Sequence, residues 1–329
     1  MIEMKEQCFG VEIEMTGVTR EEAAHALADY FGTTPEYWEH IYGSWIVKDP
    51  AGKEWKLMSD SSIHPECQSA DGYLQLDKDS AEGMPYKVEI VTPKLAYGDL
   101  SLLQECMRRM TAIGAKVNDS CGLHVHVDAS AHNRQSLKNL IGIMYSKEDL
   151  LFKALRVNEA RAIEWCQKVR EPMLKKARTL SAEETPDLTQ LENIWYEGFE
   201  GDGRTRRDHY NKSRYYALNL HSVFYRGTVE WRCFNSTLDP AKAAAYVNLC
   251  LAMSAQAIAQ RSTVMKKTRS DNELFTFRVW LVRLGLNGDE FKETRDVLLS
   301  NLDGDRAWRH DKDSYEVNRR KKKHRENER

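Results

Sequence analysis

The sequence predicts an α+β fold in which helices back one curved, mainly antiparallel β-sheet. Segments typical of strands and of helices follow one another without the regular rhythm of β–α–β units. The short strands "SWIVKD" and "EWKLMSD" are separated only by "PAG", which is typical of an antiparallel hairpin. Several strands also place charged residues on one face and apolar residues on the other, as alternation along a strand allows.

The composition is that of a globular protein with a substantial core. Of the 329 residues, 41% are hydrophobic and 30% charged, enough for one large domain or two modest ones. No repeat or boundary is visible, so we expect a single catalytic domain over residues 1–310. No apolar run approaches the roughly 20 residues of a membrane span, and "MIEMKEQCFG" lacks the pattern of a signal peptide. The seven cysteines are scattered without CxxC spacing, which favours a reduced, cytoplasmic protein.

The C-terminus differs in charge from the rest of the chain. From Asn318, "NRRKKKHRENER" contains seven Lys or Arg and two Glu, whereas the whole chain carries a net charge of −2. This stretch has no apolar residue to anchor it, so we expect residues 311–329 to form a basic, disordered tail. Nucleic-acid contact is the alternative for such a tail, but no other segment interleaves basic and aromatic residues in a binding pattern. We therefore expect neither a membrane nor a nucleic-acid partner.

The first half of the chain contains strands and two capped helices. "CFGVEIEMTGV" is the first strand and "YKVEIVTPKL" a later one. Between them, Thr19 begins a helix, with Glu22 three residues on as a capping box and Gly32 as its end. The segment "DLSLLQECMRRMTAIG" has apolar residues at helical spacing, which predicts a second helix with Asp99 as its cap and Gly114 as its stop.

The remaining segments add a loop, two strands and most of the helices. The polar, turn-rich segment His64–Pro85 predicts an inserted loop, and a helical insertion is expected over about residues 132–200. The charged segment Glu197–Arg214 is a candidate to close over a site, and the strands "YYALNLHS" and "GTVEWRCFN" follow it. Asp239 then caps an apolar helix, and helices are expected over about residues 239–300.

The stretch "CGLHVHVDAS" has an unusual polar face. If it forms a strand, His124, His126 and Asp128 share one face while three apolar residues share the other. A polar strand face rarely consists of two imidazoles and a carboxylate. This face is therefore either exposed to solvent or one wall of a metal site.

Three further strands repeat this pattern with glutamate. The charged residues are Glu12 and Glu14 in "GVEIEM", Glu89 in "YKVEIV", and Glu230 with Arg232 in "TVEWRCF". Alternation also predicts that Phe234 lies on the face of Arg232. Glutamate is a poor strand former. A solvent-exposed face explains any one of these residues, but it does not readily explain why four strands show the same pattern.

Convergence of these faces would require a counter-charge. Crowded, desolvated carboxylates have raised pKa values, so their ionisation costs stability at neutral pH. A divalent cation removes that cost, and carboxylates with one imidazole favour Mg²⁺ or Mn²⁺. Alternate residues of a strand are about 6.6 Å apart, which is wide for one ion but suits two ions about 4 Å apart. The pattern therefore predicts a pair or cluster of cations.

Six motifs, taken in order, resemble the amidoligase family, which is related to glutamine synthetase and glutamate–cysteine ligase. They are "FGVEIEM", "SDSSI", "VEIVTPKL", "CGLHVHVD", "YALNLHS" and "TVEWRCFNSTLD", and the resemblance runs from about Phe9 to Ala255. The resemblance implies a sheet like that of the glutamine synthetase catalytic domain. It also implies an ATP-dependent carboxylate–amine ligase with Mg²⁺ or Mn²⁺. Such enzymes phosphorylate a carboxylate and then let an amine displace the phosphate to form an amide.

The resemblance also implies roles for individual residues. The implied metal ligands are Glu12, Glu14, Glu89, His124 and Glu230. The implied catalytic residues are Arg232, which faces the transferring phosphoryl group, Glu230, and His126, beside the metal or on the nucleotide side. The implied cofactor-binding residues, in contact with nucleotide or substrate, are Asp60, Asn219 and Arg161. Asp128 has no role in the family pattern and is expected to cap its strand.

Two other functions remain open at this stage. A metal-dependent hydrolase could use the HxHxD strand, although Ala129 stands where metallo-β-lactamase-like hydrolases have another histidine. A non-catalytic member of the fold could bind a nucleotide or a peptide. No glycine-rich phosphate loop is present, so ATP use depends on the resemblance alone. The expected partners are a carboxylate and an amine, from an amino acid, a peptide or a protein side chain; their identity and the oligomeric state are not predicted.

Overall fold

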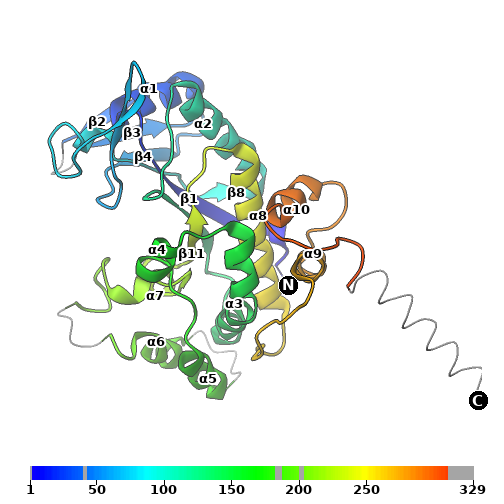
Figure 1. Ribbon diagram of the computed structural model, residues 1–329. Coiled ribbons are helices and arrows are strands. Elements are labelled where there is room, and N and C mark those ends of the chain that lie inside the picture. The colour runs from blue at the N-terminus through cyan, green and yellow to red at the C-terminus, as the bar shows by residue number, and fades with distance from the viewer. Residues whose placement is uncertain (1, 40–42, 182–186, 200–203, 310–329) are drawn as a thin grey trace, which may run out of the picture.

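The computed structural model describes residues 2–39, 43–181, 187–199 and 204–309 (Figure 1). Within these residues, the fold combines a mainly antiparallel nine-stranded sheet with helices, which confirms the predicted mixture of strands and helices. The predicted basic tail, residues 311–329, lies outside the described residues. Among the described helices, none has the length and apolar character that crossing a membrane requires.

The strands of the main sheet have the order β10–β11–β9–β1–β7–β4–β3–β2, and β8 pairs with β1. All pairings between these strands are antiparallel. The bounds are β1 Cys8–Met15, β2 Glu36–Trp38, β3 Ser44–Lys48, β4 Glu54–Met58, β7 Val88–Val91, β8 Leu95–Ala96, β9 Gly122–Asp128, β10 Leu218–Asn219 and β11 Thr228–Asn235. The segments β1 and β9, far apart in sequence, therefore lie side by side at the centre of the sheet.

Helices cover the apolar face of this sheet. The helix bounds are α1 Arg20–Phe31, α2 Leu100–Ala112, α3 Arg134–Leu155, α4 Glu159–Glu164, α5 Glu171–Thr179, α6 Thr189–Tyr196, α7 His221–Arg226, α8 Pro240–Ala259, α9 Glu273–Arg283 and α10 Lys292–Leu299. The long helix α8 is apolar on nearly all sides because it packs against β9, α2, α3 and α10 (Figure 1). Buried apolar side chains of β1 and β9 meet this layer, and each contributes about 1.5–3 kcal/mol.

Several local predictions are confirmed. Thr19 and Glu22 form the capping box of α1, and Gly32 ends that helix with φ of 69°. The hairpin of β3 and β4 is present. Asp239 caps α8 by accepting hydrogen bonds from the backbone of its first turn.

Other local predictions are wrong for identifiable reasons. The expected loop His64–Pro85 contains a separate hairpin, β5 Glu66–Ser69 and β6 Gly72–Gln75, whose two-residue turn the sequence reasoning missed. The expected strand "YYALNLHS" is a strand only at Leu218–Asn219, because the chain turns into α7 two residues later. Asp99 precedes α2, but its carboxylate accepts a hydrogen bond from Ala96 instead of capping the helix.

A β-bulge changes the face on which Phe234 lies. The pairing of β11 with β9 shifts between Trp231 and Phe234, so three residues of β11 span two residues of β9. Phe234 therefore pairs with Leu123 on the apolar face, where its ring stacks on Tyr246 of α8 at 4.4 Å between centroids. The prediction that Phe234 shares the face of Arg232 is wrong.

Candidate functional site

Strand register brings the predicted polar residues together on one face of the sheet. Glu12 of β1 lies directly opposite His124 of β9, and Glu14 lies opposite Glu89 of β7. Glu230 of β11 lies opposite His126 of β9. Directly opposed residues have Cβ atoms about 4.5–5.5 Å apart, so each pair is within contact distance. We call these six residues and Arg232 the central cluster.

The central cluster is not a solvent-exposed strand face. The exposed fraction is 9% for Glu12 and 3% for Glu14, His124 and Glu230, and Arg232 is 5% exposed. Charged side chains are rarely this buried unless they are paired or bind a ligand. The buried charges therefore belong either to an internal ion-pair network or to a ligand site.

At one end of the cluster, Arg232 and Glu230 form a compact ion pair. Arg232 Nη1 donates to Glu230 Oε1 at 2.5 Å, and Asn219 Nδ2 donates to Glu230 Oε2 at 2.7 Å. Burial alone would raise the pKa of Glu230, but Arg232 and His126 hold it at about 2. Burial alone would lower the pKa of Arg232, but the charge of Glu230 outweighs burial and raises that pKa above its usual value. Asn219 thus orients a carboxylate, while its buried Oδ1 has no hydrogen-bond partner among the described residues.

The two histidines have opposite protonation tendencies. Burial and the nearby Arg232 lower the pKa of His124 to about 4, so its imidazole is neutral at pH 7. His124 Nδ1 lies 2.9 Å from Glu12 Oε2. A carboxylate only accepts hydrogen bonds, so Nδ1 donates and the lone pair of Nε2 faces Glu14 Oε1 at 3.9 Å. Burial lowers the pKa of His126, but Glu12 and Glu230 raise it overall.

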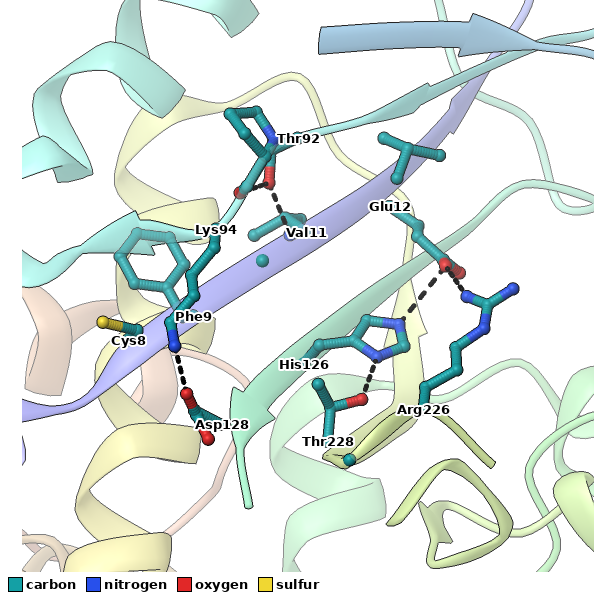
Figure 2. Close-up of a pocket in the computed structure, with 14 residues that line it drawn as sticks. Cys8, Phe9, Val11, Glu12, Thr92, Lys94, His126, Asp128, Arg226 and Thr228 are labelled. Atoms are coloured by element: carbon teal, nitrogen blue, oxygen red, sulfur yellow. Dashed lines mark hydrogen bonds and ion pairs between the residues drawn. The ribbon is translucent and has the colours of Figure 1, made fainter. Parts of the chain in front are cut away.

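His126 is held between β1 and β11 (Figure 2). Its Nδ1 lies 3.0 Å from Thr228 Oγ1, and its Nε2 lies 3.3 Å from Glu12 Oε1. The contact with Glu12 is an ion pair whose geometry is not that of a hydrogen bond. The buried Nε2 of His126 therefore has no hydrogen-bond partner among the described residues. Arg226 Nη1 also lies 3.4 Å from Glu12 Oε1. Burial alone would raise the pKa of Glu12, but His126 and His124 lower it well below its usual range.

At the other end of the cluster, carboxylates lack such compensation. Burial and the charge of Asp60 raise the pKa of Glu14 to about 8, although Glu14 Oε2 accepts a hydrogen bond from Gly122 N at 2.6 Å. Burial and the charges of Glu12, Asp60 and Glu14 raise the pKa of Glu89 well above its usual range. Three acidic side chains therefore face one another, and the arginines nearby lower the pKa values of Glu14 and Glu89 by less than burial and like charge raise them.

The donor atoms fit a set of divalent cations. Among the described residues, three groups have ligand atoms that lie within 4.8 Å of one another inside the group: Glu12, His126 and Glu230; Glu12, Glu89 and His124; and Glu14, Asp60 and Glu89. All five predicted metal ligands belong to these groups. His126, predicted as catalytic, and Asp60, predicted as a cofactor contact, join them. The excess of carboxylate oxygens and the spare Nε2 of His126 match the ligands that Mg²⁺ and Mn²⁺ prefer.

Arg161 lies beside the acidic end of the cluster. It is 5% exposed, and its Nη1 makes one long hydrogen bond of 3.5 Å to Ser120 O. Its Nε and Nη2 have no hydrogen-bond partner among the described residues. The guanidinium packs on Gly122, where a Cβ atom would lie only 2.2 Å from Nη2. A side chain at Gly122 would therefore displace this guanidinium from its position beside the acidic end.

A cavity of about 510 Å³ adjoins the cluster beyond Glu12 and His126 (Figure 2). We call it the strand-end pocket; its lining includes Gly10, Glu12, Val91, Pro93, Lys94, His126, Asp128, Arg226 and Thr228. The sequence reasoning missed Gly10, Lys94 and Arg226. Gly10 could have been identified from the sequence, because glycine inside a strand often marks a position where a ligand approaches closely.

Part of the charged segment Glu197–Arg214 contributes to the surroundings of the cluster. His209 Nε2 lies 3.0 Å from Arg226 Nη2, and Arg214 lowers the pKa of Glu89, although burial and the neighbouring carboxylates outweigh it. Arg232 Nε donates to Trp165 O at 3.4 Å, and the ring of Trp165 packs edge-on against Tyr215. Residues 200–203 of the segment lie outside the described residues, so its predicted closure over substrates stays a prediction.

Comparison with known proteins identifies a family. The crystal structure of a bifunctional glutathione synthetase from Pasteurella multocida is similar at a TM-score of 0.32 and 11% identity, over 90% of this chain and 47% of that chain. This chain thus spans about half the length of that protein, and so weak a likeness supports no argument about fold or activity. The predicted likeness to the glutamine synthetase catalytic domain stays a prediction. No curated protein sequence matches the chain. The family described as "Putative amidoligase enzyme" matches residues 5–254, so the chain belongs to the amidoligase family.

Proposed function

We propose that this protein is an ATP-dependent carboxylate–amine ligase that acts with Mg²⁺ or Mn²⁺ through an acyl-phosphate intermediate. The observation that carries the proposal is the buried central cluster, in which carboxylates and imidazoles from β1, β7, β9 and β11 adjoin two buried arginines and a cavity. An internal ion-pair network does not account for the acidic end, where burial and neighbouring carboxylates raise the pKa values of Glu14 and Glu89.

The two ends of the cluster would hold different cations. Glu14, Asp60 and Glu89 form the acidic end, while Glu12 is shared by the two groups that contain a histidine. When bound, Mg²⁺ or Mn²⁺ supplies positive charge that neutralises phosphate oxygens. The histidine that donates from Nδ1 to Glu12 keeps its Nε2 lone pair for a cation, as metal-binding histidines usually do.

The strand-end pocket is the proposed nucleotide site. It adjoins the cluster at Glu12 and His126, and the four residue steps of β1 from Cys8 to Glu12 span about 13 Å. A cavity of about 510 Å³ is within the range of about 300–1,000 Å³ typical of small-molecule sites. ATP is the largest expected small ligand, and Arg226 supplies a cation where its phosphates would approach the cluster.

The remaining residues serve the two chemical steps. First, an oxygen of the substrate carboxylate attacks the γ-phosphorus, and the bond to ADP breaks. Arg232, fixed by Glu230, presents its guanidinium to the charge that develops on the phosphoryl oxygens. The unpaired nitrogens of Arg161 bind an anionic group of the substrate. The amine nitrogen then attacks the acyl carbon, phosphate leaves, and a carboxylate of the cluster accepts the amine proton.

One assay separates this proposal from its alternatives. The purified protein would be incubated with ATP, Mg²⁺ or Mn²⁺, mixtures of amino acids and peptides as carboxylates, and hydroxylamine as a small nucleophile. We expect ADP release that requires a carboxylate and is matched by hydroxamate. Metal-dependent cleavage of amides or esters without ATP would instead identify a hydrolase. Nucleotide binding without ADP release would identify a non-catalytic member of the fold.

The structure offers no specific support for the hydrolase alternative. That function needs Asp128 as a metal ligand of the HxHxD strand. Asp128 instead forms an ion pair with Lys94, and among the described residues it belongs to none of the groups that could hold a metal ion. The carboxylates of β1 and β11, which have no role in such a hydrolase, form the centre of the cluster.

A further inference from the structure

The strand-end pocket has a charged pair at the end opposite the central cluster. Asp128 ends β9, two residues or about 6.6 Å beyond His126. Its Oδ1 accepts a hydrogen bond from Ser130 N at 2.8 Å, and its Oδ2 accepts one from Lys94 Nζ (Figure 2). The capping role predicted for Asp128 does not explain why it also lines the cavity with Lys94.

The walls near this pair are firmly placed and mostly apolar. Lys94 follows Thr92 and Pro93 on the link from β7 to β8. Thr92 Oγ1 accepts a hydrogen bond from Val11 N at 2.9 Å and donates one to Pro93 O at 3.1 Å, which fixes the link against β1. Cys8 and Pro93 line the cavity here, whereas Val91 lines its other end, opposite Glu12. Such a wall suits the flat, apolar face of a nucleobase.

Gly10 forms the floor of this part of the pocket. A Cβ atom at Gly10 would lie 3.7 Å from Thr92 Oγ1 and 3.8 Å from Pro93 O, which are ordinary contacts. The fold therefore tolerates a side chain at this position, and its absence leaves space in the cavity. Glycine inside a strand commonly marks such an approach.

We propose that Asp128 is a specificity residue that accepts a hydrogen bond from the 6-amino group of adenine, while Lys94 holds its carboxylate in place. This inference rests on the proposed function, because it needs ATP in the strand-end pocket. An ionised carboxylate has about four lone-pair sites, so the contacts of Asp128 with Lys94 and with the backbone and hydroxyl of Ser130 leave capacity for a further donor. Asp128 lines the cavity, and 25% of its side chain is exposed.

The test combines a change in the protein with a change in the ligand. Calorimetric titration would measure the affinity of the wild type and of Asp128→Ala for ATP and for purine riboside 5′-triphosphate, which lacks the amino group, both with Mg²⁺. A hydrogen bond to a charged group predicts that the wild type binds ATP about 10–100-fold more tightly. In Asp128→Ala, the two nucleotides should bind equally within about threefold.

Two further variants test whether the preference for ATP depends on this charged pair. Lys94→Ala should reduce the preference, because Asp128 loses the partner that positions it. Asp296→Ala is the matched control, since it removes an exposed ion pair with Arg306 and should leave the preference intact. Melting temperatures of all variants would show that each remains folded.

The outcomes distinguish the two proposals. Equal binding of both nucleotides by the wild type, a preference that survives in Asp128→Ala, or tighter binding of GTP than of ATP would overturn the adenine contact while nucleotide binding stands. If the folded wild type binds none of these nucleotides with Mg²⁺ or Mn²⁺, the proposed function fails, and this inference fails with it.

Discussion

The two ends of the central cluster use the same residue type in opposite electrostatic settings. At the β11 end, Glu230 pairs with Arg232 and accepts from Asn219, so its pKa is about 2. At the β7 end, Glu14 lies opposite Glu89, and burial and the charge of Asp60 raise its pKa to about 8. A glutamate on a strand thus takes its ionisation behaviour from its burial and from the charges that surround it. At the first end Arg232 supplies counter-charge from within the chain, whereas the second end depends more strongly on protons or a cation.

The largest effect should come from Arg232 at the β11 end. Arg232→Lys keeps the charge but loses the planar fork, so we expect turnover to fall by about 10²–10³-fold with ATP affinity retained. Steady-state kinetics and calorimetry would measure the two quantities. If the rate is unchanged and only the melting temperature falls, Arg232 has a structural role and no catalytic one.

Removing one carboxylate from each end should have opposite effects on stability. Without metal at pH 8, Glu230→Gln should lower the free energy of unfolding by about 3–5 kcal/mol, because Arg232 stays buried without its partner. Glu14→Gln should raise it, because like-charge repulsion falls. Urea unfolding in the presence of a chelator would measure both variants. Changes of the same sign would contradict the difference between the ends.

The acidic end should also make stability depend on pH. An unfolded glutamate loses its proton near pH 4.5, whereas folded Glu14 keeps it to about pH 8. The folded state therefore binds more protons in this window, and stability should fall as pH rises, by up to about 1.4 kcal/mol per pH unit for one group. Urea unfolding of the chelated protein from pH 5 to pH 8 would measure the slope. Mg²⁺ or Glu14→Gln should flatten it, and an equal slope in Glu14→Gln would assign it to other groups.

A smaller effect is expected at the floor of the strand-end pocket. Gly10→Val should weaken nucleotide affinity at least about tenfold, about 1.4 kcal/mol, because its side chain enters the cavity. Gly98→Val is a matched control, since Gly98 is exposed and has open space around its Cβ position. Nucleotide titration and melting temperatures would compare the two. Unchanged affinity in folded Gly10→Val would move the nucleotide out of this pocket.

The sequence predicted which residues share a face of each strand, but not which strands pair or which residues lie opposite one another. Alternation in "GVEIEM" and "GLHVHVD" placed Glu12 and His124 on polar faces, since the period of a strand is two residues. Opposition of these residues depends on tertiary register, which a single sequence does not reveal. The same limit applies to Asp60, whose turn carries it to the metal-ligand group of Glu14. It also applies to Phe234, whose face is set by a bulge.

The residues that line the strand-end pocket were the hardest to predict from the sequence. Gly10 and Arg226 border a cavity that exists only because β1, β9 and β11 end near one another (Figure 2). Lys94 and Asp128 are 34 residues apart in sequence and meet across that cavity. Long-range proximity of this kind has no local signal, in contrast to the capping box of Thr19 and Glu22.

The central claim is that the cluster binds divalent cations at both of its ends. Calorimetric titration of Mn²⁺ into the wild type, Glu14→Gln and Glu230→Gln tests it most directly. We predict more than one Mn²⁺ per chain in the wild type, and the loss of a different site in each variant. Absence of Mn²⁺ binding to the folded wild type, or binding that neither substitution alters, would contradict the account.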